Sequence, residues 1–374
     1  MRFSPRYFFA LTLGVVIPAV TGCGSFFIYP GSSTTGGSTT TSFAFFANST
    51  TKNVSAYALA SGTPVAVTGS PYAALAVSPT SLVVTPANTF LYVGGIGALY
   101  GYSINTTTGA LSILNSGQAF ASINAVSMDV SPDGNWLLVL DVDGARVDEY
   151  AINTSTGALT PATGATYSIT GKGASSPHAI RFAPSGTLVF AALGTGGDAV
   201  LNFTTSTGAL TYNTSLIGSP TSSDNALAVD STSSHLYVAR SGDGSGINAY
   251  TIASNGALTG ITGAPFATGN RPYDVVIDKT GAYLYAANST DGTISGFTIA
   301  TTGALSTISG SPFASGTGVT SLGRDSLGKY IIAASQGGSS NLTLYTFDTT
   351  TLGKLDVSKT STAGTDPTAV AMTH

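Results

Sequence analysis

Charged residues are scarce in this chain of 374 residues, where Asp, Glu, Lys and Arg together make up only 8%. Soluble domains usually carry about 25% charged residues, so Thr, Ser, Asn and Gly must cover most of the exposed surface here. The formal net charge is −4, and the basic residues form no cluster. This composition excludes nucleic acids and anionic lipid surfaces as partners that the chain would attract by charge.

Cysteine and recognised catalytic motifs are also nearly absent. Cys23 is the only cysteine, so the chain can form neither an internal disulfide framework nor a cysteine-based metal site. The sequence contains three histidines, but no phosphate-binding loop, no dinucleotide fingerprint and no nucleophile elbow. We therefore expect no metal ion and no organic cofactor.

Glycine and aromatic residues are abundant, with 46 Gly, 17 Tyr and 17 Phe, and they recur at a regular period. A glycine, usually within Gly-Ala-Leu, returns seven times, at Gly62, Gly109, Gly157, Gly208, Gly256, Gly303 and Gly353. The unit from Arg271 to Gly316 has four short β-rich runs separated by turn residues. Four strands at a period of about 40 to 50 residues are typical of a β-propeller blade.

The first run of each unit alternates between apolar residues and small or polar ones. This alternation predicts a strand with one face against the neighbouring blades and the other facing a narrow central channel. The unit that begins at Phe43 lacks its first run, and the missing run stands at the C-terminus, from Pro367 to Thr373. We therefore predict an all-β fold, a seven-bladed β-propeller with four antiparallel strands per blade. The C-terminal strand completes the first blade and closes the ring.

Residues 1–22 have the pattern of a signal peptide and lie outside the predicted fold. Arg2 and Arg6 precede an apolar stretch that extends to Val20, and residues 20–23 read Val-Thr-Gly-Cys. This pattern matches the bacterial lipobox, in which small residues precede the cysteine that receives the lipid. The alternative is an ordinary signal peptide or membrane anchor with an incidental cysteine.

Residues 23–42 are rich in Ser, Thr and Gly, which is a composition typical of flexible linkers. We expect lipidated Cys23 and this tether to hold the propeller, residues 43–374, in the bacterial cell envelope and outside the cytoplasm. Gly24 stands where a sorting aspartate would occur, so resemblance to known lipoproteins favours the outer membrane. The lipid is then the only expected membrane contact, and we expect a monomer.

His178 is the histidine most suited to chemistry, because it stands at the entry of the predicted inner strand of blade four. Loops that enter inner strands share one rim of a propeller with loops that join second and third strands. That topology places Asp141, Asp143, Arg240 and Arg271 on the same rim as His178. A histidine among carboxylates can act as a general base, and an arginine can stabilise an oxyanion. The alternative is a hydrogen-bonded histidine at the end of a strand.

Asp129 and Arg181 hold equivalent, channel-facing positions in blades three and four. Opposite charges at neighbouring positions predict either a structural ion pair or a polar, ligand-binding lining of the channel. Arg324 interrupts an otherwise apolar row of first-run residues, and the sequence offers no reason for it.

Three stretches resemble the propeller-type lactonase family, which includes bacterial 6-phosphogluconolactonases and fungal muconate-lactonizing enzymes. They are Pro177 to Gly186, Ser131 to Gly134 with the following Trp136-Leu-Leu-Val, and Leu284 to Asn288 with the later Thr293-Ile294. The resemblance covers nearly all of residues 43–374. It implies a seven-bladed propeller without metal or organic cofactor, in which a His, Arg and Glu set at one end of the channel does the chemistry.

Only part of that implied set has a counterpart in this sequence. His178 fits the family's Pro-His position, while Val126 stands at the corresponding place in blade three. Tyr273 stands where the resemblance implies an arginine, and Arg240 stands where an Asn-Glu pair would end a second strand. We therefore predict a binding or scaffold module for neutral glycans or envelope proteins, with a degraded catalytic set. The alternative is a lactone hydrolase that uses the channel rim, with His178 as its base.

The lipid anchor can be tested by labelling cells with a palmitate analogue. The wild-type protein should incorporate the label and Cys23→Ala should incorporate none, because the Cys23 thiol is the predicted acceptor. Thr21→Ser, which keeps a small residue before the cysteine, should be labelled like the wild type. Equal labelling of wild type and Cys23→Ala, measured by in-gel fluorescence, would contradict the lipobox interpretation.

Overall fold

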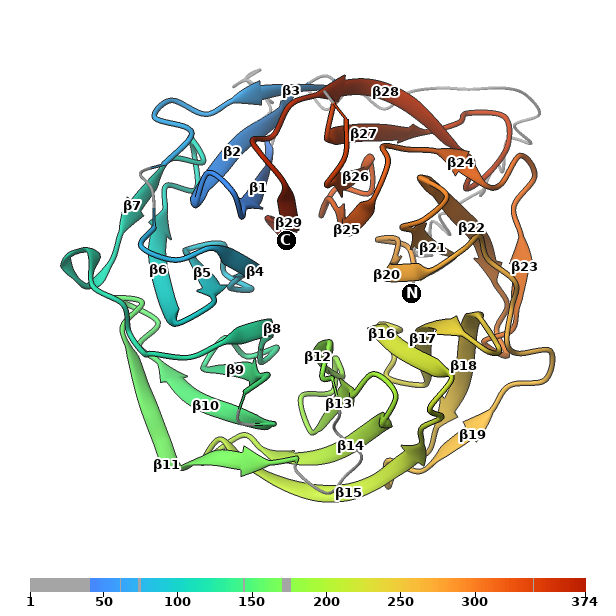
Figure 1. The fold of residues 1–374 in the computed structure, drawn as a ribbon, viewed down its shortest axis with the longest axis horizontal. Helices are drawn as coiled ribbons and strands as arrows, with labels where there is room; N and C mark the ends of the chain where they lie inside the picture. The colour runs from blue at the N-terminus through green and yellow to red at the C-terminus, as the bar shows by residue number, and fades with distance from the viewer. Residues whose placement is uncertain (1–40, 61, 73–74, 144, 170–175, 339) are drawn as a thin grey trace, which may run out of the picture. The chain divides into compact units, whose positions relative to one another are not determined.

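Seven antiparallel sheets surround a central axis in the computed structural model of the chain (Figure 1). The structure describes residues 41–60, 62–72, 75–143, 145–169, 176–338 and 340–374. The predicted signal peptide, Cys23 and nearly all of the predicted tether lie outside these residues. No helix in the described part of the chain is long and apolar enough to cross a bilayer.

Each blade contributes one strand to each of four concentric layers. The inner strands, nearest the axis, are β4 (Pro79–Val84), β8 (Ala125–Val130), β12 (Ala179–Phe182), β16 (Ser222–Val229), β20 (Pro272–Ile277), β25 (Val319–Arg324) and β29 (Pro367–Met372). The second strands are β1 (Ser42–Asn48), β5 (Phe90–Gly95), β9 (Trp136–Asp141), β13 (Leu188–Ala192), β17 (His235–Gly242), β21 (Tyr283–Asn288) and β26 (Tyr330–Ser335).

Two further layers complete the blades. The third strands are β2 (Asn53–Ala60), β6 (Ala98–Ile104), β10 (Arg146–Ile152), β14 (Gly197–Thr204), β18 (Gly246–Ile252), β22 (Thr293–Ile299) and β27 (Leu342–Phe347). The outer strands are β3 (Thr63–Ala66), β7 (Leu111–Ile113), β11 (Leu159–Ser168), β15 (Ala209–Ile217), β19 (Leu258–Gly260), β23 (Leu305–Thr307) and β28 (Leu355–Ser361). A short strand β24 (Phe313–Ala314) also pairs with β22, and η1 (Asn115–Gly117) is a single 3-10 turn.

The ring closes within blade one, as the sequence predicts. The C-terminal β29 pairs with β1 in a sheet of order β29-β1-β2-β3. Beyond the strand ladder, the Thr373 N–H donates to the Phe43 carbonyl at 3.0 Å, and the Phe43 N–H donates to Thr373 Oγ1 at 2.9 Å. Both ends of the described chain are therefore held in one sheet, and the predicted seven-bladed architecture is confirmed.

The second strands carry most of the core. Every residue of β1, β5, β13 and β26 is buried, because each of these strands lies between two neighbouring blades. A strand covered on both faces must be apolar along its whole length rather than alternating. This explains why runs such as Phe43-Ala-Phe-Phe-Ala are the most uniform part of the repeat.

The repeated glycine joins each blade to the one before it. Second-strand tyrosines donate to glycine carbonyls of the next blade, from Tyr92 to Gly157 at 3.0 Å, from Tyr237 to Gly303 at 3.0 Å and from Tyr285 to Gly353 at 2.6 Å. Gly157 has a φ of 72°, and a Cβ there would lie 2.6 Å from the Phe90 ring. Only glycine satisfies both the turn and this close approach, so the most regular landmark of the sequence is an inter-blade contact.

Candidate functional site

A β-bulge recurs near the start of the inner strands and positions one residue per blade at the rim of the channel. In six inner strands the pairing with the second strand skips a single residue, namely Thr80, Val126, Asn225, Tyr273, Thr320 and Thr368. In blade four the equivalent residue is His178, whose N–H donates to the Ala192 carbonyl that also faces Ala179. Bulges redirect a side chain out of the normal alternation. We call these seven residues the rim ring.

Four members of the rim ring connect adjacent blades. The side chains of Thr80, Asn225, Thr320 and Thr368 each donate to a backbone carbonyl at the start of the next inner strand. The Asn225 amide reaches the Pro272 carbonyl at 2.8 Å, and the Thr320 and Thr368 hydroxyls reach theirs at 3.0 Å. These bonds satisfy carbonyls that an edge strand would otherwise leave unpaired. Val126, His178 and Tyr273 make no such bond in the described part of the chain.

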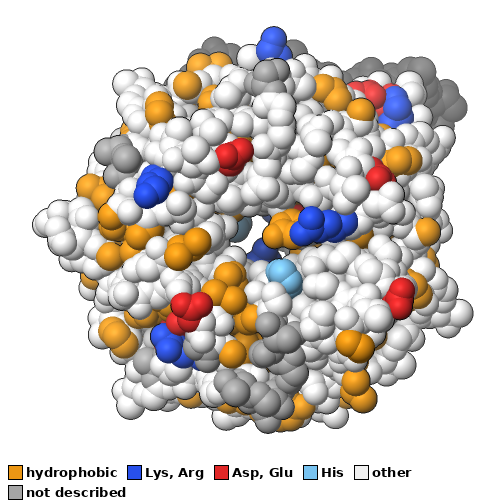
Figure 2. Space-filling view, in the orientation of Figure 1, with side chains coloured by type: hydrophobic (Ala, Val, Ile, Leu, Met, Phe, Trp, Pro, Cys, Tyr) orange, Lys and Arg blue, Asp and Glu red, His pale blue; other side chains and the backbone are white. Residues whose placement is uncertain are grey.

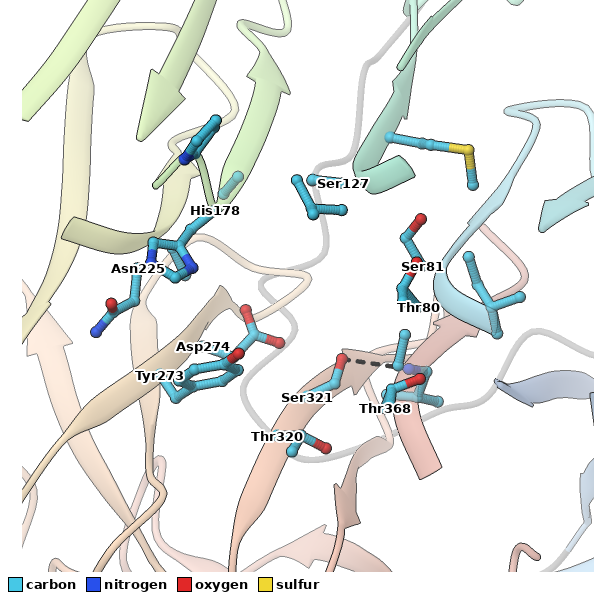
Figure 3. Close-up of a pocket in the computed structure, with 18 of the residues that line it drawn as sticks. Thr80, Ser81, Ser127, His178, Asn225, Tyr273, Asp274, Thr320, Ser321 and Thr368 are labelled. Carbon is cyan, nitrogen blue, oxygen red and sulfur yellow. Dashed lines mark hydrogen bonds between the residues drawn. The ribbon is translucent and has the colours of Figure 1, made fainter. Parts of the chain in front are cut away.

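The rim ring surrounds a cavity of about 350 Å³ at one mouth of the channel. Figure 2 shows the central opening on this face, with histidine and cationic side chains at its edge. Figure 3 shows His178, Asn225, Tyr273 and Asp274 on one side of the cavity, with the hydroxyl groups of the threonines and serines opposite. The lining therefore combines uncharged polar side chains with apolar ones.

His178 lines this cavity with a titratable imidazole ring. It is half-buried, and its ring has no hydrogen-bond partner among the described residues. Burial and the nearby positive charge of Arg271 lower the pKa of His178 below its ordinary value of 6.5, while the Asp224 carboxylate acts in the opposite direction. The imidazole is therefore neutral at neutral pH and can accept a proton or a hydrogen bond.

Arg181 and Asp274 place one charge of each sign in the same cavity. Arg181 Nη1 donates to the Ile180 carbonyl at 2.8 Å and to Ser127 Oγ at 3.3 Å. The Asp274 carboxylate accepts the backbone N–H groups of Leu322 and Val275, both at 2.8 Å. Burial raises the pKa of Asp274, and the attraction of Arg181 lowers it by a smaller amount. The two charges offset each other, so the cavity does not select strongly for charge.

The carboxylates predicted to assist His178 are engaged elsewhere. Asp141 ends β9 and forms an ion pair with Arg146 at 2.8 Å, and Asp143 accepts a hydrogen bond from the Asn124 amide. Neither aspartate lines the cavity, although Val142 between them does. The topology places them on the expected rim, but their partners come from their own blade and its entry loop.

The predicted arginines lie close to His178 without lining the cavity. Arg240 binds the Asp224 carboxylate through two hydrogen bonds of 2.6 and 2.8 Å. Arg271, a non-glycine residue with a φ of 55°, places its guanidinium 5.5 Å from the centre of the Tyr273 ring. Arg271 therefore acts on His178 through its charge, and Arg240 is neutralised by Asp224.

Asp129 and Arg181 do not form the predicted direct ion pair within the described residues, whose ion pairs all involve other side chains. Asp129 instead accepts the Phe182 N–H at 2.7 Å and the N–H of Val130 at 3.0 Å. Burial raises the pKa of Asp129, with Arg181 acting in the opposite direction through its charge. Both side chains line the second cavity of the channel.

The comparisons with known proteins agree with the seven-bladed fold. The family model described as "Lactonase, 7-bladed beta-propeller" matches residues 37–372. The chain belongs to this lactonase family. No curated protein matches it in sequence.

Solved structures from three bacteria are similar to this lactonase-family chain. A Bacteroides fragilis protein described as a candidate 6-phosphogluconolactonase has a TM-score of 0.73 and 18% identity, and the match covers 90% of this chain and 99% of that one. A Bacteroides uniformis protein with the same description has a TM-score of 0.72 and 19% identity, and the match covers 89% of this chain and 99% of that one. The periplasmic gluconolactonase of Pseudomonas aeruginosa has a TM-score of 0.70 and 16% identity, and the match covers 89% of this chain and 99% of that one. At these identities, the likeness establishes the fold.

Asp198 is a buried acid that sequence analysis did not identify in this lactonase-family propeller. It stands at a third-strand position that the strand pairing identifies in every blade, occupied elsewhere by Val54, Leu99, Val147, Ile247, Ile294 and Leu342. All seven side chains are 0% exposed. Neither carboxylate oxygen of Asp198 has a hydrogen-bond partner among the described residues.

Asp198 belongs to a polar cluster between blades four and five, beside the cavity. Burial and the neighbouring Asp224 carboxylate raise the pKa of Asp198 well above 3.8, and Arg240 offsets only part of this. Asp198 therefore keeps its proton when Asp224 is ionised. Asp224 immediately precedes the rim-ring residue Asn225, so the ion pair with Arg240 supports the rim next to His178. A comparison of equivalent positions across the seven repeats would have revealed both aspartates in the sequence.

The described residues contain no group of three or more His, Cys, Asp or Glu side chains that could hold a metal ion. The cavity chemistry therefore rests on the imidazole, the phenol of Tyr273, the hydroxyl groups and the two compensating charges.

Replacing Asp198 by the aliphatic residue of the other blades should stabilise the propeller. For Asp198→Val we expect the free energy of unfolding to rise by about 1 to 3 kcal/mol, because a buried polar group without a partner is removed. Thermal and denaturant melts at pH 7 would measure it.

The pH dependence supplies the control. Because the pKa of Asp198 is raised in the folded state, wild-type stability should fall as the pH rises from about 3.8 towards the folded pKa. Asp198→Asn should lose this pH dependence of stability, but its free energy of unfolding should not rise as it does in Asp198→Val. Unchanged melts for both variants across this pH range would contradict the assignment of Asp198 as a buried, unpartnered acid.

Proposed function

We propose that the channel mouth bounded by the rim ring binds a small, neutral, polyhydroxylated ligand such as a sugar. The observation that carries this proposal is the division of the rim ring: four members hold neighbouring blades together, whereas His178 and Tyr273 have polar groups free for a ligand. Neutral amide, hydroxyl, phenol and imidazole groups suit the alternating donors and acceptors of a sugar. A cavity of about 350 Å³ is within the range of small-molecule sites.

The predicted lipobox and tether support a location of this binding site in the cell envelope. A lipid on Cys23 would hold the propeller at a membrane, and the 20 residues of 23–42 could reach about 66 Å when fully extended, at about 3.3 Å per residue. The channel mouth would then be accessible to glycans of the envelope. The low fraction of charged residues favours neutral partners over charged ones.

A neutral glycan array, followed by calorimetry with the strongest hit, tests the binding proposal. The wild type should bind, and Tyr273→Ala should bind at least tenfold more weakly, a loss of about 1.4 kcal/mol. Tyr212→Ala, which removes a partly exposed tyrosine from the outer strand β15, is the matched control and should bind like the wild type. Absence of binding, or equal affinity for wild type and Tyr273→Ala, would overturn the proposal.

Lactone hydrolysis is the second candidate function, and the depressed pKa of His178 favours it. The imidazole would take a proton from water as the oxygen attacks the lactone carbonyl. The imidazolium would then return that proton to the ring oxygen as the ring C–O bond of the tetrahedral intermediate breaks, which releases the hydroxy acid and regenerates the neutral imidazole. Arg181 lines the same cavity and could stabilise the oxyanion. The family match and the gluconolactonase among the similar structures support this candidate.

His178→Gln distinguishes binding from catalysis, because glutamine keeps hydrogen-bonding groups but cannot act as a base at neutral pH. If the protein hydrolyses lactones, the rate on glucono-δ-lactone should fall about 100-fold or more in His178→Gln. The wild-type rate should fall as the pH drops through the lowered pKa of His178, because protonation removes the base. No turnover above the buffer rate, or an unchanged rate in the variant, would exclude His178 catalysis and leave the binding proposal standing.

A further inference from the structure

The channel has a second mouth at the far ends of the inner strands, with a cavity of about 230 Å³. Leu82, Met128, Arg181 and Val370 line this cavity as well as the first one, so the two cavities are continuous parts of one channel. The second mouth differs from the first in its charge. Arg181, Lys279 and Arg324 line it, and Asp129 is its one carboxylate side chain in the described part of the chain.

Arg324 is anomalous among the seven equivalent residues at the end of the inner strands. The other six are apolar, namely Val84, Val130, Phe182, Val229, Ile277 and Met372. Those side chains are mostly buried between blades, whereas Arg324 is exposed towards the second mouth. Six of the seven blades therefore have an apolar residue at this position, and packing between blades does not explain the guanidinium in the seventh.

The nearest carboxylates do not form ion pairs with Arg324. Asp278 accepts the Tyr283 N–H at 2.9 Å and the Thr280 hydroxyl at 2.6 Å. Asp325 accepts the N–H groups of Lys329 and Tyr330 at 2.7 and 2.8 Å. Loss of hydration lowers the pKa of Arg324, and these two carboxylates only partly oppose that effect.

The other two cations also lack ion-pair partners. None of the ion pairs in the described part of the chain includes Arg181, Lys279 or Arg324. The Asp129 carboxylate binds two backbone N–H groups rather than a cation. The His374 backbone oxygen accepts a hydrogen bond from Asn88 at 3.0 Å, and the His374 ring nitrogen Nε2 faces the Val84 carbonyl at 3.1 Å. The side chains that line the second mouth include three cations and one carboxylate in the described part of the chain, so they carry a net positive charge, which Asp278 and Asp325 offset only in part at Arg324.

We propose that this second mouth binds a small oxyanion, a phosphate or a carboxylate, on the guanidinium of Arg324. The planar guanidinium presents paired donors that match both oxyanions. Arg181 and Lys279 line the same cavity and add positive charge. The cavity of about 230 Å³ is large enough for a small anion. Arg181 lines both cavities, whereas Arg324 lines the second cavity and not the first, so the anion site can be tested at Arg324 independently of the function proposed for the rim ring.

Calorimetric titration of the full-length protein in detergent with inorganic phosphate and, separately, with succinate tests the proposal. We expect saturable binding of at least one anion, weaker at high ionic strength because the site is open to solvent. The preferred probe identifies the class of oxyanion. Arg324→Met should raise the Kd at least tenfold while keeping the melting temperature, since Met372 holds the equivalent position in blade one.

Lys329→Gln is the matched control, because Lys329 lies close to Arg324 in the chain but does not line the cavity. Its affinity should equal that of the wild type. Arg324→Lys, which keeps the charge but loses the paired donors, should bind more weakly than the wild type and more tightly than Arg324→Met. The proposal fails if the wild type binds neither anion at millimolar concentrations, or if Arg324→Met binds as tightly as the wild type.

Discussion

The structure depends on burying both faces of every sheet. The second strands are apolar along their length, so each blade needs a neighbour on both sides and the series cannot end at an open blade. The pairing of β29 with β1 meets this requirement, because it builds the first blade from both ends of the propeller sequence. The contacts of second-strand tyrosines with the repeated glycines fix the spacing of adjacent blades. Ring closure and the turn glycines are therefore consequences of one packing constraint.

That constraint leaves the channel free to vary. The inner strands are edge strands whose remaining backbone groups face the axis, and the chain satisfies many of them with side chains of the adjacent blade. Asp129 and Asp274 accept N–H groups, whereas Thr320 and Thr368 donate to carbonyls. In the sequence such polar residues look like part of a binding surface, but in the structure they hold adjacent blades together. The positions without this task, His178, Tyr273 and Arg324, are the ones available to ligands.

Internal comparison of the blades separates these two roles within a single sequence. Seven copies of one structural position show what the fold requires there, so a lone polar residue in an apolar row needs another explanation. Asp198 and Arg324 are both such exceptions: Asp198 is buried between blades four and five, and Arg324 lines the second mouth of the channel. The first mouth is nearly neutral and the second is cationic, which makes the channel electrostatically asymmetric along its axis.

The sequence alone determined the fold, because propeller signals are local and repeated. Apolar runs of constant length, turn glycines at a regular period and the displaced strand from Pro367 to Thr373 define seven blades and their closure. The composition of the sites was decided only by the tertiary structure. A bulge adds one residue and shifts the alternation, so periodicity could not predict that Asn225 and Tyr273 line the same cavity. The partners of Asp198 are equally non-local, because Asp198 meets Asp224 and Arg240 only where blades four and five pack together.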